Sequence, residues 1–169
     1  KYRVVILTVE HGDKSITSKK LAKEATKLGL ENIVVQFNGA TLRYNDGNHF
    51  VHTMDSDKGF QVNSSNTVIF VRGTPTKDSH LDLISEFERL GYCIVNNRTT
   101  INVCADKYRN YVRLKDYGLT QPKTVLIPNK DMVETSFEAL DTKFPIIMKT
   151  LRGSKGVGVL FVESKKSLD

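Results

Sequence analysis

The sequence predicts an α/β fold, in which an open, mostly parallel sheet is followed by a smaller α+β unit. Two stretches, residues 2–37 and 67–95, each contain a strand pattern, a helix pattern and a second strand pattern. Several of these strand patterns are nearly continuous apolar runs, which is typical of parallel strands buried on both faces. A third stretch, Phe144–Val162, has two short apolar runs joined by a glycine-rich loop and therefore predicts a hairpin.

The first strand-helix-strand stretch begins with the apolar strand Tyr2–Val9. The helix that follows is predicted from apolar residues at helical spacing, Leu21, Ala22, Ala25 and Leu28. Gly29 ends this helix, and Asn32–Phe37 is the next predicted strand. The two strands should be parallel neighbours joined by a right-handed crossover.

The segment after the second strand is more polar. Thr41–His52 predicts a hairpin around the pair Asp46-Gly47, because Asp-Gly is a strong signal for a two-residue turn. His49 and His52 would face opposite sides of a strand, so no metal pair is expected there. Asp55–Asn66 is polar, has no periodicity and predicts an exposed loop.

The second strand-helix-strand stretch consists of the strand Thr67–Val71, a helix through residues 83–90 and the strand Tyr92–Val95. Arg72 lies at the carboxyl end of a predicted parallel strand, where open α/β sheets bind ligands. A surface or capping arginine is the alternative interpretation. The polar segment 96–100 predicts a boundary between two domains, residues 1–96 and 97–169.

The second half is expected to contain a helix at Ile101–Tyr117, a strand at Thr124–Ile127 and a helix at Met132–Leu140. The predicted hairpin follows. Its loop carries Gly153, Gly156 and Gly158, which let the backbone adopt left-handed angles and approach a ligand closely. Lys149 ends the first strand beside this loop, so the pattern indicates a phosphate site.

Two familiar phosphate-binding patterns do not fit this loop. A P-loop needs Lys and Ser or Thr after its last glycine, and a Rossmann loop also needs a following helix. Here Gly158 is followed by Val159 and a strand. A plain hairpin with a flexible loop and a surface lysine stays open as an alternative.

Composition limits the classes of function. The 169 residues are 39% apolar and 26% charged, with a net charge of +6, which fits a globular protein that binds ATP or an acidic substrate. The lysines are scattered among acids and aromatic residues do not interleave with them, so nucleic acid is an unexpected partner. Cys93 and Cys104 are expected to be buried, reduced thiols. With no apolar run of membrane-spanning length and no signal peptide pattern, a cytoplasmic protein without a membrane partner is expected.

A strand that ends in lysine, a Gly/Ser loop and a returning strand resemble the small nucleotide-binding subdomain of the ATP-grasp superfamily, in particular the ribosomal protein S6 modification type. The resemblance places the strand lysine on Lys149 and a second lysine, in an Asp-Lys pair, on Lys107. It implies a phosphate loop made of Gly153, Ser154, Lys155, Gly156, Val157 and Gly158. It also implies that residues 1–96 are the preceding α/β domain, which helps to bind the ligase substrate, with Arg72 as the candidate residue.

The resemblance implies an ATP-dependent ligase that joins a carboxylate to an amine, of the glutamate type, through an acyl phosphate. Its partners would be ATP, a protein or peptide carboxylate and an amino acid. We expect the 169 residues to be the N-terminal part of such a ligase, without the lobe whose acidic residues hold Mg²⁺. By itself this part should bind ATP weakly or not measurably and should not turn over.

Two further hypotheses remain at this point. One is a short, non-catalytic ATP-grasp relative that acts as a binding or assembly module, which a homo-oligomer would favour. The other is an unrelated α/β domain that binds a nucleotide or phosphate.

Overall fold

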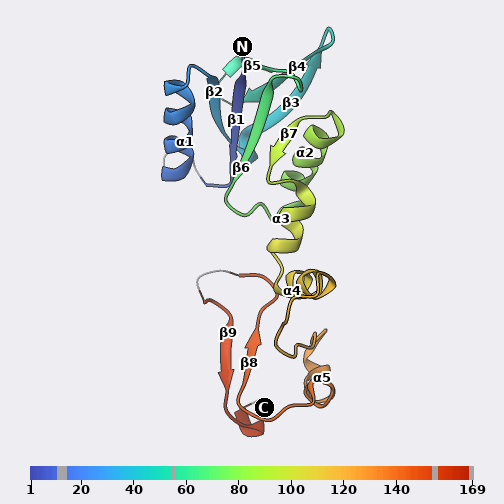
Figure 1. The fold of residues 1–169 in the computed structure, drawn as a ribbon. Helices are drawn as coiled ribbons and strands as arrows, with labels where there is room; N and C mark the ends of the chain where they lie inside the picture. The colour runs from blue at the N-terminus through green and yellow to red at the C-terminus, as the bar shows by residue number, and fades with distance from the viewer. Residues whose placement is uncertain (11–14, 55, 154–155, 168–169) are drawn as a thin grey trace. The chain divides into compact units, whose positions relative to one another are not determined.

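The computed structural model describes residues 1–10, 15–54, 56–153 and 156–167 (Figure 1). The chain divides into two compact units, unit 1 at Lys1–Ile101 and unit 2 at Asn102–Asp169. Ser154 and Lys155, two of the residues predicted for the phosphate loop, lie outside the described residues.

Unit 1 contains a four-stranded sheet of order β2-β1-β6-β7 in which each pair of neighbours is parallel. Its strands are β1 (Arg3–Thr8), β2 (Glu31–Gln36), β6 (Thr67–Arg72) and β7 (Cys93–Val95), and its helices are α1 (Ile16–Lys27) and α2 (Asp78–Arg89). This arrangement confirms the open α/β sheet predicted from the two strand-helix-strand stretches.

Both faces of this sheet are packed. On one face Val5 and Leu7 of β1 join a buried cluster with Ile84 and Phe87 of α2, and all four are fully buried. On the other face Ile6 packs in a smaller cluster against α1. The alternation of side chains along β1 therefore explains why its sequence is a continuous apolar run.

A three-stranded antiparallel sheet lies between β2 and β6 in the sequence. It consists of β3 (Ala40–Asn45), β4 (Asn48–Thr53) and β5 (Ser56–Val62), preceded by a 3-10 turn, η1, at Phe37–Gly39. The predicted hairpin is confirmed, because Asp46 and Gly47 between β3 and β4 both have positive φ, at 47° and 77°.

The exposed loop predicted at Asp55–Asn66 is wrong, because β5 occupies most of that segment and pairs with β4. Phe60 packs against the main core of unit 1 and Val62 lies within it, two residues apart on one face of the strand. Burial of these two side chains outweighs the polar composition of the segment.

Unit 2 has fewer regular elements. They are α4 (Lys107–Asp116), the 3-10 turn η2 (Lys130–Met132), α5 (Val133–Leu140), β8 (Ile146–Lys149), β9 (Val159–Val162) and the 3-10 turn η3 (Lys165–Ser167). The short helix α3 (Arg98–Cys104) spans the division between the units. The helix predicted near residues 132–140 and the final hairpin are both confirmed.

Two predictions for this half are wrong. The single helix at 101–117 is broken between α3 and α4, because the buried Asp106 caps α4 by accepting from Tyr108 N and Arg109 N, both at 3.0 Å. The strand expected at 124–127 is absent: Val125 and Ile127 are half-buried and their neighbours exposed, but no partner strand pairs with this described segment. Half-buried and exposed residues alternate in this segment as they do in a strand, so the sequence pattern alone could not show that strand pairing is absent.

Unit 2 is also sparsely packed. Among its described residues, Asp106, Ser136 and Val162 are the ones that reach the buried class. The two cysteines are free, as predicted, but the expectation that they are buried is wrong, since both are exposed. Across the described part of the chain, no helix combines the length and the apolar character that crossing a bilayer requires.

Candidate phosphate site and substrate residue

The predicted phosphate loop joins two antiparallel strands of unit 2. β8 and β9 pair from Ile146↔Val162 to Lys149↔Val159. One more bond extends the ladder beyond the strands, from Thr150 N to Gly158 O at 2.8 Å. The loop therefore begins directly after Lys149, and its two ends are held together by backbone hydrogen bonds.

The three glycines of the loop have different roles. All have positive φ, at 138° for Gly153, 79° for Gly156 and 71° for Gly158. A Cβ at Gly158 would lie 2.4 Å from Thr150 Oγ1, whereas one at Gly156 would meet nothing within 4 Å. Gly158 is therefore required both for its backbone angle and for the close approach of Thr150, whereas Gly156 is required for its angle alone.

Lys107 lies against this loop although it is more than 40 residues away in sequence. As the first residue of α4, it donates its backbone N–H to Leu151 O at 2.8 Å. Its ammonium donates to Thr150 O at 3.0 Å and to Gly153 O at 3.3 Å. A lysine ammonium has three N–H donors, so one donor stays available for a ligand. Asp106 fixes this geometry, because its carboxylate caps α4 directly before Lys107.

Lys149 is the last residue of β8, directly before the same loop. Its side chain is exposed and has no hydrogen bond or ion pair with another described residue. In the β8–β9 register it shares a face with Ile147, Val159 and Phe161, which are 50%, 41% and 62% exposed. Met148 is on the opposite face and half-buried. One face of the hairpin is thus an open apolar surface that ends in a lysine and a glycine loop.

The residues that the structure describes fit the phosphates of a nucleotide. They offer the ammonium groups of Lys107 and Lys149 and a loop of left-handed glycines, whose backbone N–H groups can bind anions. Val157, also predicted for the loop, is 72% exposed. Ser154 and Lys155 belong to the undescribed residues, so nothing in the geometry rests on them.

A cavity of about 910 Å³ adjoins this site within unit 2. α4, the segment 121–127, α5 and β8 line it, and Lys107, Lys149 and Thr150 contribute to its wall. The cavity accounts for the small number of buried side chains in the unit, because its apolar walls do not close on one another.

Arg72, the predicted substrate residue, belongs to unit 1 and not to this site. It ends β6 in register with Thr8 of β1. The residue is half-buried, and its Nε is buried without a hydrogen-bond partner among the described residues. The guanidinium therefore lies at the carboxyl edge of the parallel sheet with unused hydrogen-bonding capacity.

Sequence reasoning missed Thr150, whose carbonyl accepts from Lys107 and whose hydroxyl donates to Arg152 O at 2.7 Å. Its position between the strand lysine and the first loop glycine was the available signal.

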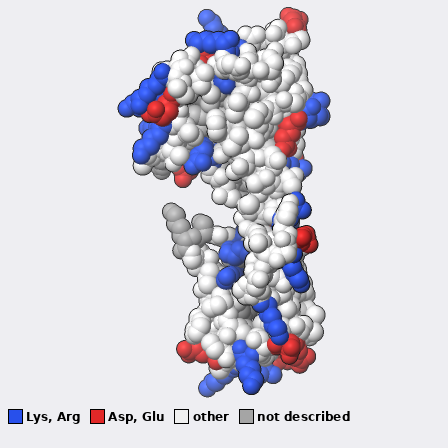
Figure 2. Space-filling view, viewed as in Figure 1, with Lys and Arg blue, Asp and Glu red and all other residues white. Residues whose placement is uncertain are grey.

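No metal site was predicted within the chain, and the described residues contain no group of three or more His, Cys, Asp or Glu that could hold a metal ion. Figure 2 shows basic and acidic side chains near one another at several places along the margins of the visible face, with mostly uncharged surface between them.

A family model matches the second part of the chain. The model of the RimK-like ATP-grasp domain matches residues 104–169, which include α4, both candidate lysines and the glycine loop. This segment is therefore similar to RimK-like ATP-grasp domains. The resemblance noted from the strand lysine and the loop is thus confirmed.

Two curated proteins similar to this chain are a synthase and a probable ligase. N-acetylaspartylglutamate synthase A of Mus musculus is 29% identical over 105 residues, which cover 60% of this chain and 28% of the mouse protein. A probable alpha-L-glutamate ligase of Coxiella burnetii is 28% identical over 87 residues, which cover 52% of this chain and 29% of the ligase. The matches thus span less than a third of either relative.

Solved structures show that the likeness in fold extends over both units. The RimK domain protein ATP-grasp of Sphaerobacter thermophilus has a TM-score of 0.65 at 18% identity and covers 98% of this chain and 55% of its own. The N5-carboxyaminoimidazole synthase of Aspergillus clavatus, solved with ADP and 5-aminoimidazole ribonucleotide, has a TM-score of 0.61 at 14% identity and covers 99% of this chain and 42% of its own. At these identities the likeness establishes the fold alone, and it confirms the predicted fold class.

Proposed function

We propose that this chain is part of an ATP-dependent carboxylate–amine ligase of the glutamate type. In such a ligase this part binds the phosphates of ATP and contributes a substrate surface. In this proposal residues 1–96 are the domain that precedes the ATP-grasp fold, and residues 97–169 are its small nucleotide-binding subdomain. The observation that carries the proposal is the convergence of Lys107, Lys149 and the glycine loop in unit 2.

Each group in this site has a distinct role in the proposal. Lys107 positions the loop, because two of its three donors hold the carbonyls of Thr150 and Gly153. Its third donor and the ammonium of Lys149 bind phosphate oxygens, and the loop N–H groups neutralise the remaining charge. The apolar face formed by Ile147, Val159 and Phe161 is suited to a less polar part of the nucleotide.

Bound ATP would supply the phosphoryl group that activates a carboxylate for attack by an amine. The chain's own contribution is binding, orientation and exclusion of water, since phosphoryl transfer depends mainly on positioning and charge neutralisation. We propose Mg²⁺ as a further cofactor, held by groups other than the described residues of this chain. Arg72 of unit 1 is the proposed contact for the anionic part of the substrate.

The test is hydroxylamine trapping of an activated carboxylate by the full-length natural protein, with ATP and with glutamate or a glutamyl peptide. Lys149→Ala should lower the trapping rate about tenfold or more, since it removes a charge-assisted hydrogen bond worth roughly 1.5–3 kcal/mol. Lys143→Ala is the matched control, because Lys143 is an exposed lysine of the same unit directly before the hairpin. Equal rates for the two variants would contradict the proposed role of Lys149.

A further inference from the structure

Two polar side chains at the carboxyl edge of the sheet in unit 1 have unused hydrogen-bonding groups. Thr8 is 1% exposed, and its Oγ1 has no partner among the described residues. Arg72 is its register partner on β6, and the buried Nε of Arg72 is likewise unpartnered. An unsatisfied buried polar group costs roughly 1–3 kcal/mol, so two of them side by side need an explanation.

Both side chains point to the face of the sheet that α1 covers. Ile6 and Phe70, two residues before Thr8 and Arg72, pack in the same cluster as Ala25 of α1. Because side chains alternate along a strand, Thr8 and Arg72 share this face. Ser18 is fully buried and lies on the helical stripe of Ala25, so it faces the sheet near the beginning of the helix.

The amino end of α1 adds further donors at this edge. Ser15 occupies the N-cap position but its side chain makes no cap hydrogen bond. Its hydroxyl pairs instead with Ser18 Oγ at 2.6 Å. The first turn of the helix contains no acidic residue, so no helix side chain there neutralises the positive end of the helix dipole.

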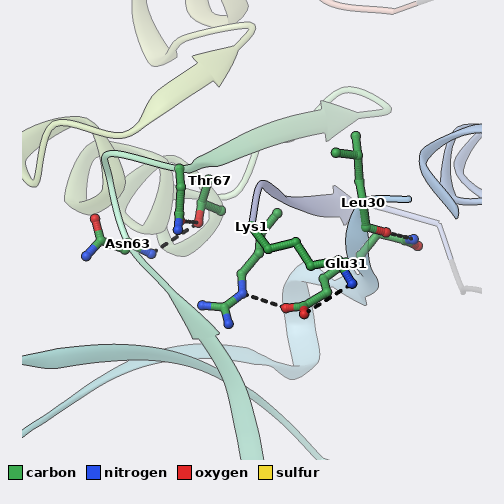
Figure 3. A network of polar contacts seen from close by, with 8 residues as sticks. Lys1, Leu30, Glu31, Asn63 and Thr67 are labelled. Carbon is green, nitrogen blue, oxygen red and sulfur yellow. Dashed lines mark hydrogen bonds and ion pairs between the residues drawn. The ribbon is translucent and has the colours of Figure 1, made fainter. Parts of the chain in front are cut away.

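The opposite edge of the same sheet has comparable residues whose polar groups are satisfied, as Figure 3 shows. Arg3 donates its Nε to Glu31 Oε2 at 2.7 Å, and Lys1 lies 3.6 Å from Glu31 Oε1. Thr67 accepts from Asn63 N at 3.1 Å and donates to Asn66 Oδ1 at 3.1 Å. The register of β1 and β6 thus places an Arg beside a Thr at each edge of the sheet, Arg3 with Thr67 and Arg72 with Thr8. At the carboxyl edge, Thr8 Oγ1 and Arg72 Nε have no hydrogen-bond partner among the described residues.

Topology places the unpartnered pair where open α/β sheets bind ligands. From β1 the chain continues to β2 on one side, and from β6 it continues to β7 on the other. β1 and β6 are adjacent, so the order of the sheet reverses between them. The crevice outside the carboxyl ends of strands at such a point is the usual ligand position of these sheets.

We infer that the carboxyl edge of unit 1 is a binding site for an oxyanion, a carboxylate or a phosphate group. Arg72 Nε–H, the Thr8 hydroxyl and the first-turn N–H groups of α1 can all donate, and no described residue accepts a hydrogen bond from the Arg72 Nε–H. A ligand with acceptor oxygens and negative charge satisfies all of them at once. The inference rests on the proposed function in one respect, that it takes this oxyanion to be part of the ligase substrate.

The test uses the ¹⁵N-labelled 169-residue chain and follows the arginine Nε–Hε signals by NMR. Sodium acetate and sodium phosphate are titrated separately, with sodium chloride at matched ionic strength as a third arm. The Arg72 signal should shift and saturate with a dissociation constant on the order of 1–10 mM, as expected for a few contacts to a small anion. The Arg3 signal, already bonded to Glu31, is the internal control and should stay in place.

Three variants give the site its residue-level test. Thr8→Val should weaken binding about tenfold, whereas Thr8→Ser should stay within about twofold of the unchanged chain. Arg72→Lys keeps the charge but removes the Nε–H, so its binding is followed by the backbone amide signals instead, and it should also lose affinity. Saturation by acetate identifies a carboxylate ligand and saturation by phosphate alone a phosphoryl ligand; both support an oxyanion site.

The inference is overturned if the Arg72 signal does not saturate, moves together with Arg3, or responds equally to chloride. It is also overturned if Thr8→Val binds as tightly as Thr8→Ser. None of these results bears on Lys149 in unit 2, so nucleotide binding by the same sample separates failure of this site from failure of the proposed function.

Discussion

The two units of this chain differ in how much of their own apolar surface they bury. Unit 1 contains two packed clusters, with Val5, Ile69 and Phe87 fully buried among many others. Unit 2 leaves the apolar face of its hairpin exposed and lines an open cavity of about 910 Å³. Large exposed apolar surface usually indicates a binding face. The contrast teaches that unit 1 is stabilised by its own core, whereas unit 2 leaves apolar surface that is open to a ligand or partner.

Hydrogen exchange should show the largest difference between the units. Amides of Val5 and Ile69 should be protected about a thousandfold more than those of Ile147 and Phe161, a gap of roughly 4 kcal/mol in opening free energy. The reason is that opening β8–β9 exposes little surface that is not already exposed. Similar protection in both pairs, measured by NMR without ligand, would remove the basis of the comparison.

A pair of phenylalanine substitutions tests the same contrast through packing. Phe87→Ala in the core of unit 1 should lower the free energy of unfolding by about 3–5 kcal/mol, because it leaves a cavity among fully buried neighbours. Phe161→Ala, at a side chain 62% exposed, should change it by no more than roughly 0.5 kcal/mol. Urea denaturation measures both, and a large loss for Phe161→Ala would show that the hairpin face is covered in the free chain.

Two threonines refine the comparison within unit 1. Thr67→Val should cost about 1–3 kcal/mol, because it leaves Asn63 N and Asn66 Oδ1 without their partner. Thr8→Val should be neutral within roughly 0.5 kcal/mol, since the hydroxyl it removes has no partner in the described chain. Thermal or urea unfolding without added anion is the measurement, and equal costs would mean that Thr8 is hydrogen-bonded in the free protein.

Two glycines make a smaller test in unit 2. Alanine at Gly156 must adopt positive φ and should cost about 1 kcal/mol, whereas alanine at Gly158 also brings its Cβ to 2.4 Å from Thr150 Oγ1. Gly158→Ala should therefore destabilise the closed loop by about 1 kcal/mol more than Gly156→Ala. Exchange of the Thr150 amide, which donates to Gly158 O, reports the difference. Identical effects would show that Thr150 does not approach Gly158 as closely as described.

The sequence predicted most of the fold of unit 1 because its apolar runs and turn residues act locally. The strand β5 escaped prediction because its pairing with β4 and the burial of Phe60 and Val62 depend on distant parts of the chain. In unit 2 the helix break at Asp106 was hidden, since an Asp can occupy a helix interior or cap a new helix.

The candidate site was predictable only where its residues are close together in the sequence. Lys149 and the loop glycines are local in sequence, so the strand-loop-strand pattern located them. The two bonds from the Lys107 ammonium to the loop, and the register of Thr8 with Arg72, are long-range geometry that periodicity does not contain. The resemblance to a family supplied Lys107, but its role as the residue that holds the loop came from the structure.

Titration of the ¹⁵N-labelled chain with Mg²⁺ and ATP tests the central claim most directly. The amides of Thr150, Gly153, Gly156 and Gly158 should shift together and saturate at a dissociation constant on the order of 1 mM. Lys149→Ala should weaken this binding about tenfold or more, and Lys143→Ala should leave it within about twofold. Saturable shifts that the two lysine substitutions weaken equally, or leave equally unchanged, would contradict the claim that Lys149 and the glycine loop bind the phosphates of ATP.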